Sequence, residues 1–342
     1  MKRVLLCRTD AVGDLILTLP VARSLKATHP DLEISLLAAK YTAPLLAGES
    51  YLDNVVAISK RSLDNLNEVN ALARDLKRVS FDAAVLFYPR LSLALAMYLA
   101  KIPIRIGTSR RAYSIFFNRR VSLHRRDSGK HELDLNYELA EQGFGELKRF
   151  EPMITVLPDE SKSSDRLLAQ SDIGERETFV LIHPLSHGSA PNWPIERYVE
   201  LASRITLKGH RVVITGSALE SDDIAAHFGR LGEGVVNLAG KTDLPQLKGM
   251  IKRACLVVSG STGPIHIAGA VGTFAVGIYP PESTLSPVRW GPRGSANKLF
   301  VPSVDDSKGN ARDLMASIPV ESVAEFIISR LSADIKSRAN SE

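Results

Sequence analysis

The amino-acid sequence predicts an α/β protein made of two successive doubly wound domains, each with a parallel sheet between helices. Two observations predict this class. Short runs of β-branched residues alternate with amphipathic stretches of helical period, and this alternation is interrupted once, near the middle of the chain. Strands that alternate with helices pair in parallel, because each helix returns the chain to the start of the next strand. The 342 residues are enough for two such domains.

The first domain is expected over residues 1–155. Its strands are predicted at Val4–Arg8, Glu33–Leu37, Val55–Ile58, Ala83–Tyr88 and Pro103–Gly107. The chain starts with basic residues, but the apolar run that follows is short and is closed by Arg8. This start indicates a first strand and not a signal peptide.

The interruption lies at Pro152–Asp165, where two prolines and a Ser-Lys-Ser-Ser run predict a linker. The second domain is expected over residues 156–342. Its strands are predicted at Thr178–His183, Arg211–Thr215, Val235–Leu238, Cys255–Ser259 and Phe274–Tyr279. A final helix is expected over about residues 320–337, where apolar residues recur at helical spacing at Val323, Phe326, Ile327, Leu331 and Ile335.

Composition gives an ordinary globular balance, with 44% hydrophobic and 24% charged residues and no apolar run of membrane-spanning length. Cys7 and Cys255 lie in apolar strand-like runs, which fits a reducing cytosol and a core role for both. The segment Lys101–His131 holds nine Lys or Arg residues against one acid, Asp127. Two interpretations of this segment stay open. It is either an ordinary solvated surface or a patch that binds phosphorylated lipid headgroups or nucleic acid.

The strand Val4–Arg8 leads into the turn Thr9-Asp10-Ala-Val-Gly13-Asp14 and then into a helical pattern. Such a turn places its polar residues at the carboxyl edge of the sheet, where open α/β sheets bind ligands. The turn contains neither the G-x-G-x-x-G pattern of a dinucleotide site nor a P-loop. Two roles are open for Asp14: stabilising the helix N-terminus, or acting as a general base.

A more specific pattern follows the strand at Cys255–Ser259, where Gly260-Ser-Thr-Gly-Pro-Ile-His266 opens a helix. Pro264 suits the first helical position, with Gly263 or Thr262 as the cap. The open backbone N–H groups at such a helix start form a site for a pyrophosphate. His266 lies in the first turn beside this anion site, so we favour a ligand contact over a structural role.

Two further loops follow strands of the second domain and should reach the same edge of its sheet. One is His183-Pro-Leu-Ser186-His-Gly-Ser189, which supplies hydroxyl and imidazole groups. The other is Gly216-Ser-Ala-Leu-Glu220. Two roles are open for Glu220: an acid at a helix start, or an acceptor of hydrogen bonds from ribose hydroxyls.

Three motifs together resemble glycosyltransferase family nine, the ADP-heptose:lipopolysaccharide heptosyltransferases and their relatives. They are Gly13-Asp14 with the following Leu-Thr-Leu-Pro, the His183-Pro-x-Ser segment that ends in Trp193-Pro194, and Ser261-Thr-Gly-Pro-Ile-His266. Each motif is weak alone, but their order and spacing, from residue 3 to about residue 293, make the set specific.

The resemblance implies a GT-B fold, with two Rossmann-like domains facing a central cleft. The acceptor is then expected on the first domain and the nucleotide-sugar on the second. It also implies inversion at the anomeric carbon, with Asp14 as the base and with no metal and no cofactor. The donor-binding residues that it implies are Ser186, Ser189, Glu220, Ser261, Thr262, Gly263 and His266. The sequence contains no Asp-x-Asp, the metal–diphosphate motif of the other common glycosyltransferase architecture, which agrees.

The resemblance also names the partners: a nucleotide-diphosphate sugar, with ADP-heptose favoured, an acidic glycolipid acceptor, and the cytoplasmic face of the inner membrane. No nucleic-acid partner is expected. Because the family places its acceptor on the first domain, the basic segment becomes the acceptor side, and we expect a flexible loop there with Arg119, Arg120 and Lys130 as contacts. The other arginines of this segment are Arg105, Arg110, Arg111, Arg125 and Arg126.

Two departures put the identity of the sugar in question. Heptosyltransferases usually carry Asp where this chain has Ser261, and Lys just before Trp-Pro where it has Pro191-Asn192. Arg289 and Arg293 are candidate replacement cations and equally candidate surface residues. A GT-B relative with another nucleotide-sugar, and a catalytically silent glycan- or lipid-binding member, therefore stay open beside the heptosyltransferase.

Overall fold

The structure of the protein is a computed structural model. It describes residues 1–59, 63–125, 128–186, 188, 190–282, 284–303 and 310–339, without the side chains of residues 334–339. The chain divides into two compact units, Met1–Thr155 and Val156–Glu342. No helix in the described ranges is long and apolar enough to cross a membrane.

The first unit holds a six-stranded parallel sheet with the order β3-β2-β1-β4-β5-β6. Its strands are β1 (Arg3–Arg8), β2 (Glu33–Ala39), β3 (Asn54–Ile58), β4 (Ala83–Leu86), β5 (Ile104–Thr108) and β6 (Arg119–Val121). Its helices are α1 (Val12–Ile16), α2 (Leu19–Thr28), α3 (Leu66–Val79), α4 (Leu91–Leu99) and α5 (Glu132–Phe144), with 3₁₀ turns at η1 (Ala43–Leu46) and η2 (Ala112–Phe116).

The second unit repeats this topology, with the sheet order β12-β11-β10-β7-β8-β9 and all pairs parallel. Its strands are β7 (Phe179–His183), β8 (Arg211–Ile214), β9 (Val235–Asn237), β10 (Leu256–Ser259), β11 (Phe274–Ile278) and β12 (Asn297–Phe300). Its helices are α6 (Pro158–Ala169), α7 (Ile195–Thr206), α8 (Ser221–Phe228), α9 (Leu244–Arg253), α10 (Gly263–Val271), α11 (Pro287–Trp290), α12 (Ala311–Ala316) and α13 (Val320–Ala339).

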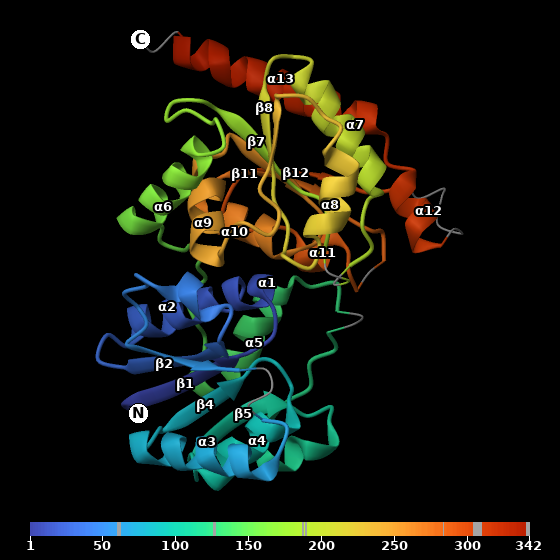
Figure 1. Ribbon diagram of the computed structural model, residues 1–342. Helices are drawn as coiled ribbons and strands as arrows, with labels where there is room; N and C mark the ends of the chain where they lie inside the picture. The colour runs from blue at the N-terminus through green and yellow to red at the C-terminus, as the bar shows by residue number, and fades with distance from the viewer. Residues whose placement is uncertain are drawn as a thin grey trace. The chain divides into compact units, whose positions relative to one another are not determined.

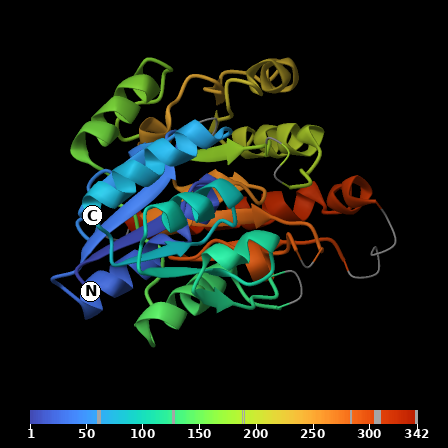
Figure 2. The same ribbon diagram turned by 90° about the horizontal axis from the view of Figure 1, so that it is seen from below.

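Helices cover both faces of each sheet. In the second unit, α6, α9 and α10 lie on one face and α7, α8 and α13 on the other (Figure 1). In the first unit, α3 and α4 pack together on one face, and they lie in front of the sheet when the molecule is seen from below (Figure 2). The apolar sides of these helices and of the strands form the cores. The central strands β4, β7 and β10 are therefore fully buried, as their continuous apolar runs require.

The predicted α/β class and its parallel sheets are confirmed, and so is the final helix. The predicted linker at Pro152–Asp165 is wrong in its second half, because α6 begins at Pro158. Pro158 occupies the first helical position, and the Glu160 carboxylate accepts a hydrogen bond from the N–H of Leu157, which caps the helix start. Two short edge strands, β6 and β12, were not predicted.

Both sheets have a switch point where the strand order reverses. In the first unit, β1 lies between β2 and β4, and in the second unit β7 lies between β8 and β10. Ligands of open α/β sheets bind outside the carboxyl ends of the strands at such switch points. The helix α1, with Asp14 in its first turn, follows β1, and the loops with Ser186 and Thr262 follow β7 and β10. The topology therefore brings the predicted site loops to the switch point of each sheet.

Candidate active site

Asp14 lies in the first turn of α1, where an acid is favourable to the helix dipole. Its carboxylate does not cap the helix: the N-cap residue is Ala11, which has no capping side-chain bond. The carboxylate instead forms an ion pair with Nη2 of Arg8, the last residue of β1, and the Asp14 side chain is 18% exposed. Asp14 is thus partly accessible and is held by a specific cation.

Arg8 is buried, with 2% of its surface exposed, and its guanidinium group contacts four side chains. Its Nε donates to Asp10 at 2.8 Å, and its Nη1 donates to Glu132 at 3.4 Å and to Asn136 at 3.3 Å, while Nη2 contacts Asp14. A charge removed from water needs such partners, because an unpaired buried ion is strongly unfavourable. Arg8 therefore joins the first turn of α1 to the first turn of α5.

Sequence reasoning missed Arg8, Asp10 and Glu132 as parts of this site. A signal for the first two was present, since a charged residue at the end of an apolar strand, two residues before an acid, is unusual. Glu132 lies 124 residues further along the chain and carried no local signal. Its place next to Arg8 follows only from the packing of α5.

Burial raises the pKa of Asp10, against the opposing effect of the neighbouring Arg8 charge. The Tyr41 hydroxyl donates to the backbone carbonyl of Asp10 at 2.6 Å, and burial raises the pKa of Tyr41 to about 12. Tyr41 is therefore a neutral hydrogen-bond donor at this loop near neutral pH. It fixes the backbone between Arg8 and Asp14.

A cavity of about 340 Å³ lies in the first unit at the ends of β4 and β5. Three arginines from the basic segment line it, together with apolar side chains: Arg110, Arg111, Arg125, Leu86, Phe87, Pro89, Thr108, Leu123 and Leu139. Arg110 Nη1 lies 2.8 Å from His124 Nδ1. Arg125 Nη1 contacts the Glu132 carboxylate, and its Nη2 donates to the Phe87 carbonyl at 3.3 Å. Three guanidinium groups around one cavity favour an anionic occupant.

The predicted acceptor contacts lie elsewhere in this segment. Arg119 and Arg120 are exposed on β6, which pairs with β5, so the expected flexible loop does not include them. Arg120 Nε donates to the Phe117 carbonyl at 3.0 Å. Lys130 Nζ lies 2.5 Å from Glu138 on α5. The cavity is lined by Arg110, Arg111 and Arg125 and not by these three residues. Arg126 lies outside the described residues.

In the second unit, the loop between β10 and α10 has a built hydroxyl network. Ser259 Oγ donates to the carbonyl of His183 at 2.9 Å and lies 2.9 Å from Thr262 Oγ1. A hydroxyl has one proton, so Thr262 must donate to Ser259. Thr262 is the N-cap of α10, and Pro264 takes the second helical position after Gly263. Pro264 has no N–H, so Gly263 and Ile265 supply the N–H groups of the first three helical positions, which have no acceptor within a helix and can bind an anion.

His266 and Ser261 flank this helix start. His266, in α10, is 4% exposed. Ser261 is half-buried; burial raises the pKa of Tyr279, and the nearby Ser261 side chain opposes this shift. The Tyr279 hydroxyl donates to the Trp290 carbonyl at 2.8 Å. The Ser261 side chain therefore lies near the contact between Tyr279 and Trp290 of α11.

The other two loops of the second unit are also closed by side chains. His183 Nδ1 lies 3.0 Å from Thr215 Oγ1, and burial lowers the pKa of His183 to about 4, against the opposing charge of Glu220. His183 is therefore neutral at pH 7. The Glu220 carboxylate accepts from the Ser217 N–H at 3.0 Å and from its hydroxyl at 2.6 Å, at the N-cap of α8.

The Ser186 hydroxyl donates to the Ala190 carbonyl at 2.8 Å and so closes the loop after β7. Ser189, the neighbouring predicted donor contact, lies outside the described residues. Trp193 is fully buried, and its Nε1 donates to the Ile318 carbonyl at 3.2 Å. The Trp-Pro pair therefore anchors the start of α7 in the core.

Arg289 and Arg293 belong to the segment that packs on this region. The Arg289 guanidinium lies 5.0 Å above the Trp290 ring. The backbone of Arg293 lies against Gly269 of α10, where an added Cβ would lie 2.2 Å from the Arg293 carbonyl oxygen. Only glycine permits this approach, so the segment is held close to the helix that carries His266.

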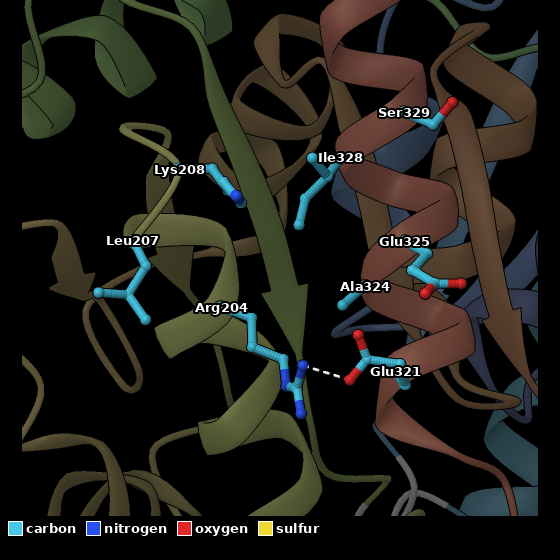
Figure 3. A pocket seen from close by; sticks show the side chains of 8 residues that line it. All are labelled: Arg204, Leu207, Lys208, Glu321, Ala324, Glu325, Ile328 and Ser329. Atoms are coloured by element: carbon cyan, nitrogen blue, oxygen red, sulfur yellow. Dashed lines mark ion pairs between the residues drawn. The ribbon is translucent and has the colours of Figure 1, made fainter.

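A second cavity, of about 540 Å³, lies away from these loops, between α7 and α13 (Figure 3). The ion pair of Arg204 with Glu321 bridges the two helices there. This cavity is lined by Arg204, Leu207, Lys208, Glu321, Ala324, Glu325, Ile328 and Ser329. Leu207 and Lys208 precede β8, which places the cavity at the amino edge of the sheet, opposite the predicted donor loops.

Within the described ranges, no three or more His, Cys, Asp or Glu side chains lie together so that they could hold a metal ion. Each unit thus holds its own candidate site: a carboxylate paired with a buried arginine in the first unit, and a helix N-terminus with hydroxyl groups in the second.

Two doubly wound units with loops at their switch points have the GT-B architecture. A comparison with models of protein families identifies the family to which the chain belongs. Residues 69–309 match the model of glycosyltransferase family 9 (heptosyltransferase). The chain belongs to glycosyltransferase family 9, and the protein is a glycosyltransferase, as the motifs predict.

Individual relatives agree with this assignment. The chain is 28% identical to the lipopolysaccharide core heptosyltransferase OpsX of Haemophilus influenzae, over 81% of this chain and 79% of the relative. It is 25% identical to lipopolysaccharide heptosyltransferase 3 of Escherichia coli, over 78% of this chain and 79% of the relative.

Solved structures confirm the predicted GT-B fold. A glycosyltransferase family 9 protein of Veillonella parvula superposes with a TM-score of 0.85 at 18% identity, covering 97% of both chains. ADP-heptose lipopolysaccharide heptosyltransferase II of Escherichia coli superposes with a TM-score of 0.81 at 22% identity, covering 98% of this chain and 99% of that chain.

Proposed function

We propose that this protein transfers a heptose from ADP-heptose to an acidic lipopolysaccharide core acceptor, with inversion and without a metal. In this reaction the acceptor hydroxyl gives its proton to Asp14, and its oxygen attacks the anomeric carbon. The bond from that carbon to the diphosphate oxygen breaks, and the nucleoside diphosphate leaves. Attack from the side opposite the leaving group inverts the anomeric configuration.

One observation carries this proposal: Asp14 follows β1 at one switch point, and the α10 N-terminus follows β10 at the other. The unit Met1–Thr155 then holds the acceptor, and Val156–Glu342 the donor. The α10 N–H groups, with Thr262, Gly263 and His266, stabilise the charge that develops on the leaving diphosphate. Ser186, Ser189, Glu220 and Ser261 supply the remaining donor contacts. Metal independence rests on the absence of Asp-x-Asp from the sequence.

The proposed acceptor contacts are Arg119, Arg120 and Lys130 and, in addition, the arginines that line the cavity of the first unit. Its anionic preference suits the phosphates and acidic sugars of a lipopolysaccharide core, because guanidinium groups bind such groups bidentately. The exposed arginines on β6 suit a second task, contact with the anionic cytoplasmic face of the inner membrane. A cytoplasmic, peripheral enzyme follows from this proposal, with no nucleic-acid partner.

A second candidate is a family member that uses another nucleotide-sugar. Ser261 favours it, because a neutral hydroxyl stands where the family resemblance leads us to expect a carboxylate. Thermal-shift measurements with ADP, UDP, GDP and dTDP decide the nucleotide, since a specific ligand stabilises the fold by mass action. The largest shift is expected with ADP.

Transfer is then measured with ADP-heptose and a lipopolysaccharide acceptor that lacks core heptose, in the presence and absence of EDTA. Full activity with EDTA and an inverted anomeric centre in the product, assigned by NMR, are expected. A larger shift with another nucleotide supports the second candidate. No transfer with any donor, despite nucleotide binding, supports a silent binding protein.

A further inference from the structure

The charged groups around Asp14 form one connected network. Arg8 contacts Asp10, Asp14 and Glu132, and Glu132 also contacts Arg125. Glu132 is fully buried, and Arg125 is 22% exposed at the wall of the arginine-lined cavity. The network therefore runs from the cavity to the proposed base.

Two cations and three carboxylates make up this network. If all were ionised, it would carry one net negative charge in a mostly buried place. Burial raises the pKa of Asp10, and the adjacent Arg8 charge opposes this shift. The other titratable neighbours are Tyr41, whose hydroxyl contacts the Asp10 backbone, and His131, which caps α5 next to Glu132. Arg8 is the cation in direct contact with the Asp14 carboxylate.

Two residues of α5, Glu132 and Asn136, hold the Arg8 guanidinium group through Nη1, the nitrogen that does not contact an aspartate. Its Nη1 donates to Glu132 and Asn136, both fully buried on α5, while Nε and Nη2 point to the two aspartates. A guanidinium group is planar, so holding one edge sets the direction of the other. Asn136 is itself fixed, because its Nδ2 donates to the Leu17 carbonyl at 3.0 Å.

We propose that Arg8 is a positioning residue that orients Asp14 and keeps it ionised, and that Glu132 holds Arg8 in place for this task. The role in the reaction rests on the proposed function, in which Asp14 takes the acceptor proton. A base must be ionised to accept a proton, and a cation in direct contact favours the ionised form. Glu132 acts in the opposite electrostatic direction while it supplies the geometry.

The test separates charge from geometry by measuring the pKa of Asp14 directly, through a carbon-13 carboxyl NMR titration of the full chain. Arg8→Gln removes the charge, and we expect the Asp14 pKa to rise by about 1 to 3 units. Arg8→Lys keeps the charge without the planar contacts, so the pKa should stay near the parent value while kcat falls at least tenfold. The donor KM should stay unchanged in both.

Glu132→Gln is expected to shift the Asp14 pKa in the opposite direction. It keeps an oxygen that accepts from Arg8 and Arg125 but removes a negative charge, so the Asp14 pKa should fall. This variant also carries the test if Arg8→Gln fails to fold. Arg78→Lys is the matched control, since Arg78 forms an exposed ion pair with Asp75 on α3, and it should change neither the pKa nor kcat.

An Asp14 pKa that is the same in the parent and in the available charge-removing variants overturns the proposal, and so does full kcat in Arg8→Lys. The titration needs no turnover, so it stands apart from the proposed function. If Asp14→Asn keeps full transfer while the pKa values move as expected, the base assignment fails and the charge network remains. If Asp14→Asn abolishes transfer while the pKa values do not move, only the positioning role fails.

Discussion

The ammonium group of Lys248 lies 2.8 Å from the carboxylate of Glu160, and the Lys248 side chain is fully buried. The same carboxylate accepts the N–H of Leu157 at 2.7 Å. This pair joins α9 to α6, the first helix after the boundary between the two units. A buried ion pair adds little net stability when intact, but removing one partner leaves an uncompensated charge.

Lys248→Met is therefore expected to lower the free energy of unfolding by about 3 to 5 kcal/mol. Urea denaturation followed by circular dichroism measures this loss. Arg78→Met, which breaks the exposed pair with Asp75, is the control and should cost about 1 kcal/mol or less. Equal losses in the two variants would mean that the Glu160 carboxylate is not left uncompensated when Lys248 is removed.

A pH dependence of stability follows from His183, whose pKa burial lowers to about 4. Unfolding returns His183 to an ordinary pKa near 6.5, so between about pH 6.5 and pH 4 the unfolded chain binds a proton that the folded chain does not. The His183 contribution is fully present above pH 6.5 and is lost as the pH falls through this window.

The parent should accordingly lose about 1.4 kcal/mol of stability per pH unit more than His183→Gln over this window. Urea denaturation of both proteins from pH 7.5 to pH 4.5 gives the difference, in which titrations common to both proteins cancel. Parallel curves would show that His183 titrates normally in the folded protein.

The arginine-lined cavity and the exposed β6 arginines are expected to have separable roles. The double variant Arg110→Gln and Arg111→Gln should raise the acceptor KM at least tenfold and leave the donor KM unchanged, because it removes two cations from the cavity. Charge reversal of Arg119 and Arg120 should weaken binding to anionic liposomes, with a parent affinity that falls as salt rises. Steady-state kinetics and co-sedimentation at two salt concentrations measure these effects. Unchanged kinetics in the first variant would remove the cavity from the acceptor site, and unchanged liposome binding in the second would make β6 an ordinary solvated face.

His266→Ala is expected to weaken the affinity for a nucleoside diphosphate more than for the free nucleoside. The reason is its place in α10, whose N-terminus is proposed to bind the diphosphate. Calorimetric titration with ADP and adenosine gives both affinities. If the two fall equally, or neither falls, His266 has a structural role only.

Much of the fold could be predicted because its signals are local. The strand β7 and the helix α13 are apolar runs with clear periodicity, and both lie where expected. The strands β6 and β12 were missed because they are short, and β6 carries two exposed arginines. The start of α6 was missed since Ser-Lys-Ser-Ser favours a loop locally, whereas the capping by Glu160 and the packing on α9 favour a helix.

The candidate site has parts that a local sequence signal marks and parts that only tertiary packing brings together. Asp14 and Thr262 follow strands directly, so a local motif marks them. The contact of Arg8 with Glu132 joins residues 124 positions apart, and the cavity gathers three arginines from two loops. Neither the Arg8–Glu132 contact nor the cavity is marked by a local pattern in the sequence, because only tertiary packing brings these residues together.

The central claim is that Asp14 takes the proton from the acceptor in a glycosyl transfer, and Asp14→Asn tests it most directly. The measurement is the single-turnover rate of sugar transfer from ADP-heptose to the lipopolysaccharide acceptor, with ADP affinity and circular dichroism as controls for binding and folding. We predict a rate about a hundredfold to ten-thousandfold below the parent, with ADP affinity and fold unchanged. A rate close to that of the parent would contradict the claim.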